Sequence, residues 1–288
     1  CSPLVKMTNI TAIYQGELNT LDQIKVSPLS RAYTFSDSIY EVIPYFSGKP
    51  LYYEEHFDRM TQSANLMSLN VNFDSVASDI KQLAAKLTNQ DGYIYYQISR
   101  GVDLIRSHFY QDDLAIERFG YAMPASFPSS PISAMLCEDD RWGKCNIKST
   151  SLLGNVLAMN KAKSQGCQEV VMHKDGFMTE AGASNVFYFD SAGSVRTSSL
   201  SENILPGITR QILIKALENT PYSVKEGSCA ISDFNDSPCM WLTSSTKGML
   251  PLTHLIGTDY KLEENYKGYQ DVVELFNSAM KLHLEALE

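Results

Sequence analysis

The stretch CNIKSTSLLGNVLAMNKAKSQG, residues 145–166, sets a lysine, Lys148, just before a predicted helix. The helix should end at Gly166, because glycine is typical of a helix C-terminus. Its apolar residues are expected to face mostly inward; they are Leu152, Leu153, Val156, Leu157 and Met159. Apolar surroundings and the positive end of a helix dipole favour the neutral amine that a Schiff-base lysine needs. Taken alone, a lysine at this position is more often a solvated residue.

The composition favours a small molecule as the partner. The chain has 288 residues and a formal net charge of -9, with 24 Lys and Arg against 33 Asp and Glu. Nucleic acids and anionic membranes attract clustered cations, so neither is expected as a partner. No apolar run approaches the length of about 20 residues that a membrane span needs.

The cysteines and histidines indicate neither a metal site nor a redox dithiol. Six cysteines include no CxxC pair, and five histidines include no HxxxH pattern. Reduced thiols and a cytoplasmic location are therefore expected. The sequence begins with Cys1 rather than Met, which would fit a trimmed chain or an N-terminal lipidated cysteine.

The pattern along the chain predicts two domains of mixed α+β and α/β character. Residues 1–121 should form an N-terminal α+β domain, with two strands in 40–53 around the turn Ser47-Gly48-Lys49-Pro50 and helices over 54–70 and 74–90. In the first of these helices one face should be buried, formed by Phe57, Met60, Ala64 and Met67. The proline- and serine-rich stretch 122–132 is the expected linker. Residues 133–288 should form a larger, β-rich domain, with a tight hairpin at Asp175-Gly176.

Three further segments could carry chemistry, although each has a simpler explanation when taken alone. The sequence ILPGITR offers the backbone N–H groups of Gly207, Ile208 and Thr209 at a helix start, where a phosphate binds well. Hydroxyl donors follow in LTSST, residues 242–246. Glu180 stands at a strand end beside small residues, where a carboxylate can pair with a buried cation or nitrogen. A helix cap and a solvated acid are the structural alternatives.

Taken in order, these segments resemble the fold-type IV, or class IV, pyridoxal-phosphate aminotransferases, and most closely D-amino acid aminotransferase. The resemblance rests on RWGKCNIKSTSLLGNVLA, TEAGASNVF, ILPGITR and LTSST, and it spans nearly the whole chain. It implies that Lys148 holds the aldehyde of pyridoxal 5'-phosphate as an aldimine and then moves the substrate's α-proton. It also implies that 133–288 is the PLP-binding domain, in which Glu180 pairs with the pyridine nitrogen, and that Arg59 pairs with the phosphate. The other implied cofactor contacts are Leu205, Gly207, Ile208, Thr209, Ser244 and Ser245.

The same resemblance implies how the substrate carboxylate is bound. In ISRGVDLIRSHFYQDD, Arg106 and His108 match a pair that grips the carboxylate together with Tyr40. In the family this pair reaches into the partner subunit's site, which implies a homodimer with shared active sites. The chain departs from the family pattern at FSDS, residues 35–38, where glycines are usual, and by one extra residue between Arg100 and Arg106. Lys247 is unusual too, and it places a cation near the substrate side chain.

Several functions fit these residues. The first hypothesis is a ping-pong transaminase that moves the amino group of a D-amino acid, such as D-alanine, to a 2-oxo acid. The second is a 4-amino-4-deoxychorismate lyase, which uses the same lysine to eliminate pyruvate, and the third is a branched-chain L-amino acid aminotransferase. A degenerate fold that binds without turnover is the alternative from another class, but Lys148, Glu180 and Arg59 together argue against it.

Overall fold

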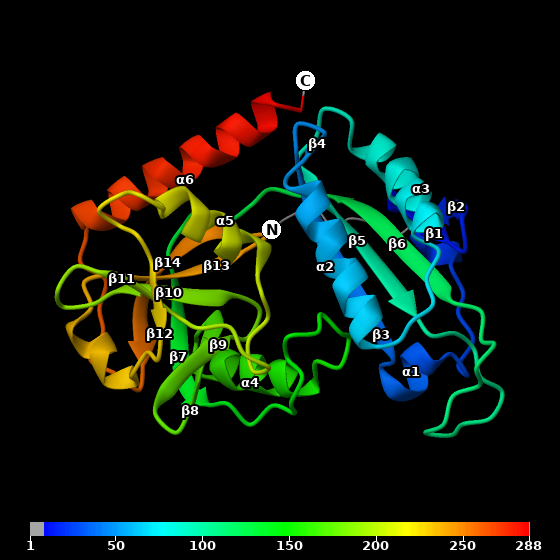
Figure 1. The fold of residues 1–288 in the computed structure, drawn as a ribbon, viewed down its shortest axis with the longest axis horizontal. Helices are drawn as coiled ribbons and strands as arrows, with labels where there is room; N and C mark the ends of the chain where they lie inside the picture. Colours follow the sequence, from blue (N-terminus) through cyan, green and yellow to red (C-terminus); the bar gives the residue numbers. More distant parts are fainter. Residues whose placement is uncertain (1–8, 288) are drawn as a thin grey trace. The chain divides into compact units, whose positions relative to one another are not determined.

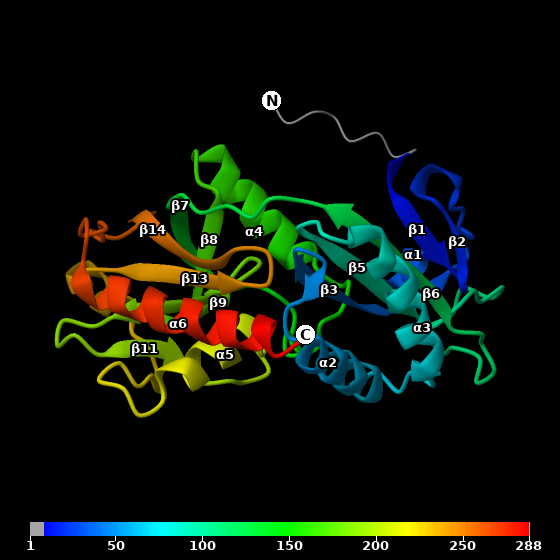
Figure 2. The same cartoon turned by 90° about the horizontal axis from the view of Figure 1, so that it is seen from above.

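The chain divides into two compact units. The computed structural model describes residues 9–287, so Cys1 lies outside the described residues. The first unit comprises the chain up to Ser126 together with 147–151, and the second comprises 127–146 and the residues from Leu152 onward. Both units combine helices with a sheet (Figures 1 and 2), which confirms the predicted α+β class. Residues 147–151 belong to the first unit, although the residues on both sides of them belong to the second. The sequence pattern does not predict this.

An antiparallel sheet forms the framework of the first unit. Within residues 9–287 it has six strands in the order β2-β1-β6-β5-β3-β4. The tight turn between β3 and β4 lies where Ser47 and Gly48 predict it. The strands are β1 (Thr11–Tyr14), β2 (Glu17–Thr20), β3 (Ser38–Phe46), β4 (Lys49–Pro50), β5 (Gly92–Ser99) and β6 (Glu117–Pro124).

Two helices cover one face of this sheet (Figure 1). The helices of this unit are α1 (Arg31–Phe35), α2 (Tyr53–Leu66) and α3 (Phe73–Ala84), with short 3-10 helices at Leu21–Gln23 and Ala85–Leu87. The predicted inward face of α2 is confirmed, because Met60 and Ala64 are buried against the sheet. Asn72 begins α3, and its side chain accepts hydrogen bonds from the N–H groups of Asp74 and Ser75. The core therefore fixes α2, which carries Arg59.

A mixed sheet forms the framework of the second unit. In the described part of the chain it has eight strands in the order β12-β11-β10-β13-β14-β7-β8-β9. The predicted hairpin at Asp175-Gly176 is confirmed, since it joins β8 to β9. The strands are β7 (Ile132–Glu138), β8 (Glu169–Lys174), β9 (Phe177–Ala181), β10 (Asn185–Phe189), β11 (Val195–Ser198), β12 (Lys225–Gly227), β13 (Met240–Ser244) and β14 (Gly248–Ile256).

Helices α4 (Leu153–Ser164), α5 (Ile208–Leu217) and α6 (Lys267–Glu285), with a 3-10 helix at Ile231–Asp236, complete the second unit. The predicted inward face of α4 is wrong, because Leu153, Val156 and Leu157 are 57%, 51% and 61% exposed. The buried positions of α4 are Gly154 and Ala162. At Gly154 an added Cβ would lie 2.9 Å from Arg141 Cγ, so close packing requires a small residue there. The larger apolar side chains consequently point outward.

Candidate active site

Lys148 lies beside Tyr40 in the first unit. The N–H of Tyr40 donates to the Lys148 carbonyl at 3.0 Å, and the N–H of Thr150 donates to the Ser38 carbonyl at 3.0 Å. The segment 147–151 is thereby attached to the first residues of β3. Lys148 Nζ lies 4.2 Å from the centre of the Tyr40 ring. Two predicted site residues that are distant in sequence are therefore neighbours.

Arg59, the predicted phosphate ligand, is held by a carboxylate that the sequence analysis missed. Glu41 on β3 is fully buried and accepts Arg59 Nε at 2.7 Å and Nη2 at 2.8 Å. His56 Nδ1 lies 2.8 Å from the same carboxylate. Burial raises the pKa of Glu41, but Arg59 and His56 lower it more, so its net pKa lies well below the ordinary value. An acid inside the apolar strand YEVIPYF was the available signal, because buried acids are almost always paired.

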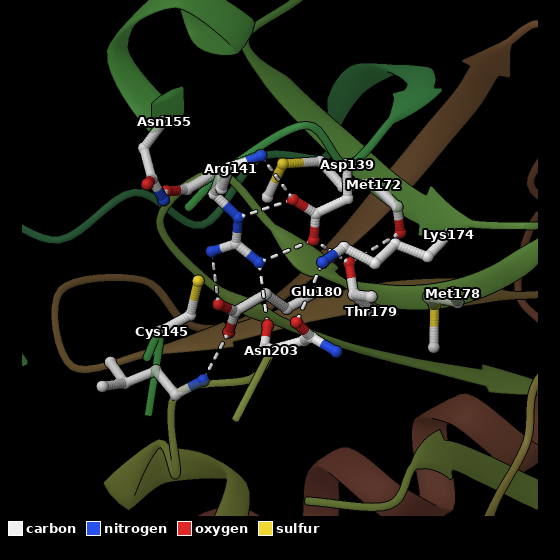
Figure 3. Close-up of polar contacts among 12 residues, drawn as sticks. Asp139, Arg141, Cys145, Asn155, Met172, Lys174, Met178, Thr179, Glu180 and Asn203 are labelled. Carbon is white, nitrogen blue, oxygen red and sulfur yellow. Dashed lines mark hydrogen bonds and ion pairs between the residues drawn. The ribbon is translucent and has the colours of Figure 1, made fainter. Parts of the chain in front are cut away.

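Glu180 lies at the centre of a buried polar cluster in the second unit (Figure 3). One carboxylate oxygen, Oε1, accepts Arg141 Nη1 at 2.7 Å. The other, Oε2, accepts the backbone N–H of Leu205 at 3.0 Å and Asn185 Nδ2 at 3.2 Å. Burial raises the pKa of Glu180 to about 7, although Arg141 and the Leu205 N–H oppose the rise. Arg141, which sequence reasoning also missed, belongs to the quoted RWGK stretch and stands seven residues before Lys148.

The start of α5 forms an anion-binding arrangement. The first N–H groups of a helix have no partner within the helix, and the helix dipole places positive charge there. Gly207 precedes α5 without a side-chain cap. A Cβ at Gly207 would lie 2.1 Å from Asn185 Oδ1, so the backbone passes closer than any other residue allows. Asn185 pairs in register with Thr243 on β13, which links the helix start to the LTSST segment.

Thr243 carries a buried hydroxyl that lacks a hydrogen-bond partner in the part of the chain that the structure describes. Such a group is costly unless a ligand satisfies it. Ser244 directly follows, and its hydroxyl accepts the N–H of Lys247 at 3.1 Å. The unsatisfied hydroxyl and the uncapped helix start fit a phosphate group. Among residues 9–287, no cluster of three His, Cys, Asp or Glu side chains could hold a metal ion.

Lys247 forms an ion pair within the second unit. Its Nζ lies 3.2 Å from Oε2 of Glu169, which is fully buried, and 3.3 Å from Ser184 Oγ. Glu169 also accepts the N–H groups of Val170 and Gly182. The pair connects the loop after β13 to the start of β8, and the contact with Ser184 connects it to the loop after β9. A contact between Lys247 and the substrate side chain stays a prediction.

Arg106 and His108 are exposed residues of the segment between β5 and β6 in the first unit. The aromatic ring of Phe35 lies beneath both: its centre is 4.7 Å from the Arg106 guanidinium carbon and 5.5 Å from the His108 ring centre. Arg31 Nη1 donates to the Ser107 carbonyl at 2.7 Å. Ser36, where the family usually has glycine, adopts a positive φ of 52°. The serine therefore preserves the left-handed turn after α1.

Comparison with known proteins identifies the family. The family model described as amino-transferase class IV matches residues 38–255. The chain belongs to the class IV aminotransferases. A D-alanine aminotransferase of Listeria innocua serovar 6a is 34% identical over 235 residues, covering 79% of this chain and 81% of the relative.

Solved structures of class IV enzymes superpose on nearly the whole of this chain. The branched-chain amino acid aminotransferase of Escherichia coli superposes with a TM-score of 0.85 at 19% identity, covering 93% of each chain. A putative 4-amino-4-deoxychorismate lyase of Legionella pneumophila superposes with a TM-score of 0.76 at 21% identity, covering 90% of this chain and 97% of that one. These likenesses establish the fold.

The chain is an enzyme that depends on pyridoxal 5'-phosphate (PLP), and its family fits amino acid and 2-oxo acid substrates. The residues present fit this cofactor. The start of α5 and the Thr243 hydroxyl suit its phosphate, and the Glu180 carboxylate suits a protonated pyridine nitrogen. No helix among the described residues is long and apolar enough to cross a bilayer.

Proposed function

We propose that this enzyme moves the amino group of a D-amino acid, such as D-alanine, to a 2-oxo acid by a ping-pong route. The observation that carries the proposal is the Arg106-Ser107-His108 segment, which Phe35 and Arg31 hold in place. A guanidinium fork with a second donor matches the two oxygens of a carboxylate. The similarity to a D-alanine aminotransferase supports the same substrate class.

The proposal assigns a residue to each chemical task of the reaction. PLP supplies an electron sink for the charge left at the substrate Cα when its proton is removed. Lys148 would hold the cofactor aldehyde and would take the proton from the substrate Cα. Glu180 would accept a hydrogen bond from the pyridine nitrogen and keep a proton there. The residues that would hold the phosphate are Arg59, Gly207, Ile208, Thr209, Ser244 and Ser245, and Leu205 would pack against the ring.

A homodimer with shared active sites is part of the proposal. The side chains around the Arg106-Ser107-His108 segment are apolar but exposed: Leu104 is 82% exposed and Phe109 is 87% exposed. The second unit has another exposed apolar group on α4, formed by Leu153, Val156 and Leu157. Clustered exposed apolar side chains are typical of protein interfaces. Both groups would be covered in a dimer, with Arg106 and His108 serving the partner's site.

A half-reaction tests the substrate class. The purified holoenzyme is mixed separately with D-alanine, L-leucine and 4-amino-4-deoxychorismate, while the cofactor absorbance and pyruvate are followed. We expect conversion to the aminated cofactor with D-alanine, with one pyruvate formed for each cofactor consumed. Pyruvate from 4-amino-4-deoxychorismate, without a lasting response to D-alanine, would instead assign a lyase. A response to L-leucine alone would assign a branched-chain L-amino acid aminotransferase.

The role of Lys148 is tested by substitution. Lys148→Ala should lower the rate of this half-reaction by at least about 1,000-fold, because both the covalent attachment and the base are lost. Lys163→Ala is the matched control, since Lys163 is an exposed lysine of α4 and should leave the rate unchanged. Equal rates for the two variants would show that Lys148 is not the catalytic lysine.

A further inference from the structure

The guanidinium of Arg141 donates four hydrogen bonds inside the cluster around Glu180 (Figure 3). It is 8% exposed. Its Nε and Nη2 donate to the two oxygens of Asp139 at 2.9 and 2.8 Å, and Nη2 also donates to the Asn203 carbonyl at 2.9 Å. Its Nη1 donates to Glu180 Oε1 at 2.7 Å. The guanidinium therefore bridges two buried carboxylates.

Asp139 is itself fixed, so the direction of the Arg141 side chain is fixed too. The Thr179 hydroxyl lies 2.6 Å from Asp139 Oδ2, and the Asp139 N–H donates to the His173 carbonyl at 2.7 Å. The backbone N–H of Arg141 also donates a hydrogen bond to Asp139 Oδ1 at 3.2 Å. Bidentate pairing of an arginine with a carboxylate is among the most specific contacts in proteins. Asp139 thus aims the remaining nitrogen, Nη1, at Glu180.

We propose that Arg141 is a positioning residue that keeps Glu180 an ionised hydrogen-bond acceptor for the pyridine nitrogen. The three donors on Glu180, from Arg141, Asn185 and Leu205, leave its carboxylate in the role of acceptor. Arg141 has no assigned contact with the cofactor and acts through Glu180. The inference rests on the proposed role of Glu180, but it is independent of which amino acid the enzyme uses.

The physical reason is the balance between burial and charge at Glu180. Burial raises the pKa of this carboxyl to about 7, and Arg141 opposes the rise both by its charge and by its hydrogen bond. An opposite charge at this distance typically lowers a carboxyl pKa by about one to three units. Without Arg141 the buried acid would be neutral near pH 7. A neutral acid leaves the proton on Glu180 rather than on the pyridine nitrogen, and the cofactor then accepts electrons less well.

The protonation of Glu180 tests this directly. The carboxyl band of Glu180 is followed by infrared spectroscopy of the cofactor-free, full-length protein from pH 4 to 10, and it is assigned by subtracting the spectra of Glu180→Gln. In Arg141→Gln the midpoint should rise by about one to three pH units relative to the wild type. Arg141→Lys keeps the positive charge, so its Glu180 titration should have a lower midpoint than that of Arg141→Gln. A wild-type midpoint in Arg141→Gln would overturn the proposal.

The control separates electrostatics from a merely structural role. Arg118 pairs with the buried carboxylate of Asp79 at 3.0 Å in the first unit, so Arg118→Gln removes a comparable pair without touching Glu180. In Arg118→Gln the midpoint of the Glu180 titration should equal that of the wild type. A shift in Arg118→Gln equal to that in Arg141→Gln would overturn the proposal.

A second readout covers the case in which cofactor-free Arg141→Gln does not fold. The holoenzyme is prepared with PLP labelled with ¹⁵N in its ring, and the ring nitrogen is titrated by NMR. This nitrogen should lose its proton at lower pH in Arg141→Gln than in the wild type, and equal titrations would overturn the proposal. Neither the infrared nor the NMR titration uses an amino acid substrate. Both therefore test the role of Arg141 even if the enzyme does not react with D-alanine.

Discussion

Glu41 holds Arg59 by two parallel hydrogen bonds, from Nε to Oε1 at 2.7 Å and from Nη2 to Oε2 at 2.8 Å. Strand β3 and helix α2 supply the two residues, and both side chains are buried. This pairing orients the arginine proposed to bind the cofactor phosphate. It also compensates the cost of burying its charge.

Glu41→Gln should weaken both the first unit and its binding of PLP. The amide keeps the shape but removes the negative charge that compensates Arg59, and breaking a buried pair costs about 3–5 kcal/mol. Hydrogen exchange of the α2 amides should become faster, and a PLP titration should show weaker affinity. Glu54→Gln, at an exposed position of the same helix, is the control. Equal PLP affinity in the two variants would argue against an orienting role for Glu41.

Gly207→Ala should impair the start of α5. Its Cβ would lie 2.1 Å from Asn185 Oδ1, so the backbone or Asn185 must move, at a cost of about 1–3 kcal/mol. Urea unfolding followed by tryptophan fluorescence measures this, because both tryptophans, Trp142 and Trp241, belong to the second unit. Gly143→Ala has no heavy atom within 4 Å of its Cβ and should change stability little. An equally small change at Gly207 would contradict the close approach.

The cofactor-free second unit should become less stable as the pH rises from about 4.5 to 7. The pKa of Glu180 is raised to about 7 in the folded protein, so the folded state binds more protons than the unfolded state in this window. At 1.36 kcal/mol for each pH unit, the loss is on the order of 3 kcal/mol. Urea unfolding of the wild type and Glu180→Gln, compared at pH 4.5 and pH 8, measures it. If the free energy of unfolding changed equally with pH in the wild type and in Glu180→Gln, Glu180 would not be protonated in this range.

Mixing two inactive variants tests the shared active site. If Arg106 serves the partner's site, a dimer of one Arg106→Ala chain and one Lys148→Ala chain contains one intact site and one doubly altered site. After random reassortment half of the dimers are mixed, so about one quarter of the wild-type activity should appear. Activity that stays at the level of the separate variants would place Arg106 and Lys148 in the same protomer's site. The mixture of Lys148→Ala with Glu180→Gln is the control and should stay inactive.

Much of the fold was predictable because its signals are local. The spacing of Met60 and Ala64 predicts the buried face of α2, and Asp175-Gly176 predicts a hairpin that the structure confirms. The face of α4 was not predictable in this way. Its apolar side chains have helical spacing, but the close contact of Gly154 with Arg141 turns them outward. A periodic pattern identifies a helix face without identifying whether the core or another chain covers it.

The sequence by itself determined the family, the two-domain class and the residues available for chemistry, including Lys148, Glu180 and Arg59. Tertiary structure alone decided their partners: Glu41 for Arg59, Arg141 for Glu180, and Tyr40 for Lys148. The reason is physical. Propensity, periodicity and turn chemistry act over a few residues, whereas a buried charge is paired by whichever residue strand register and helix packing bring to it from a distant part of the chain.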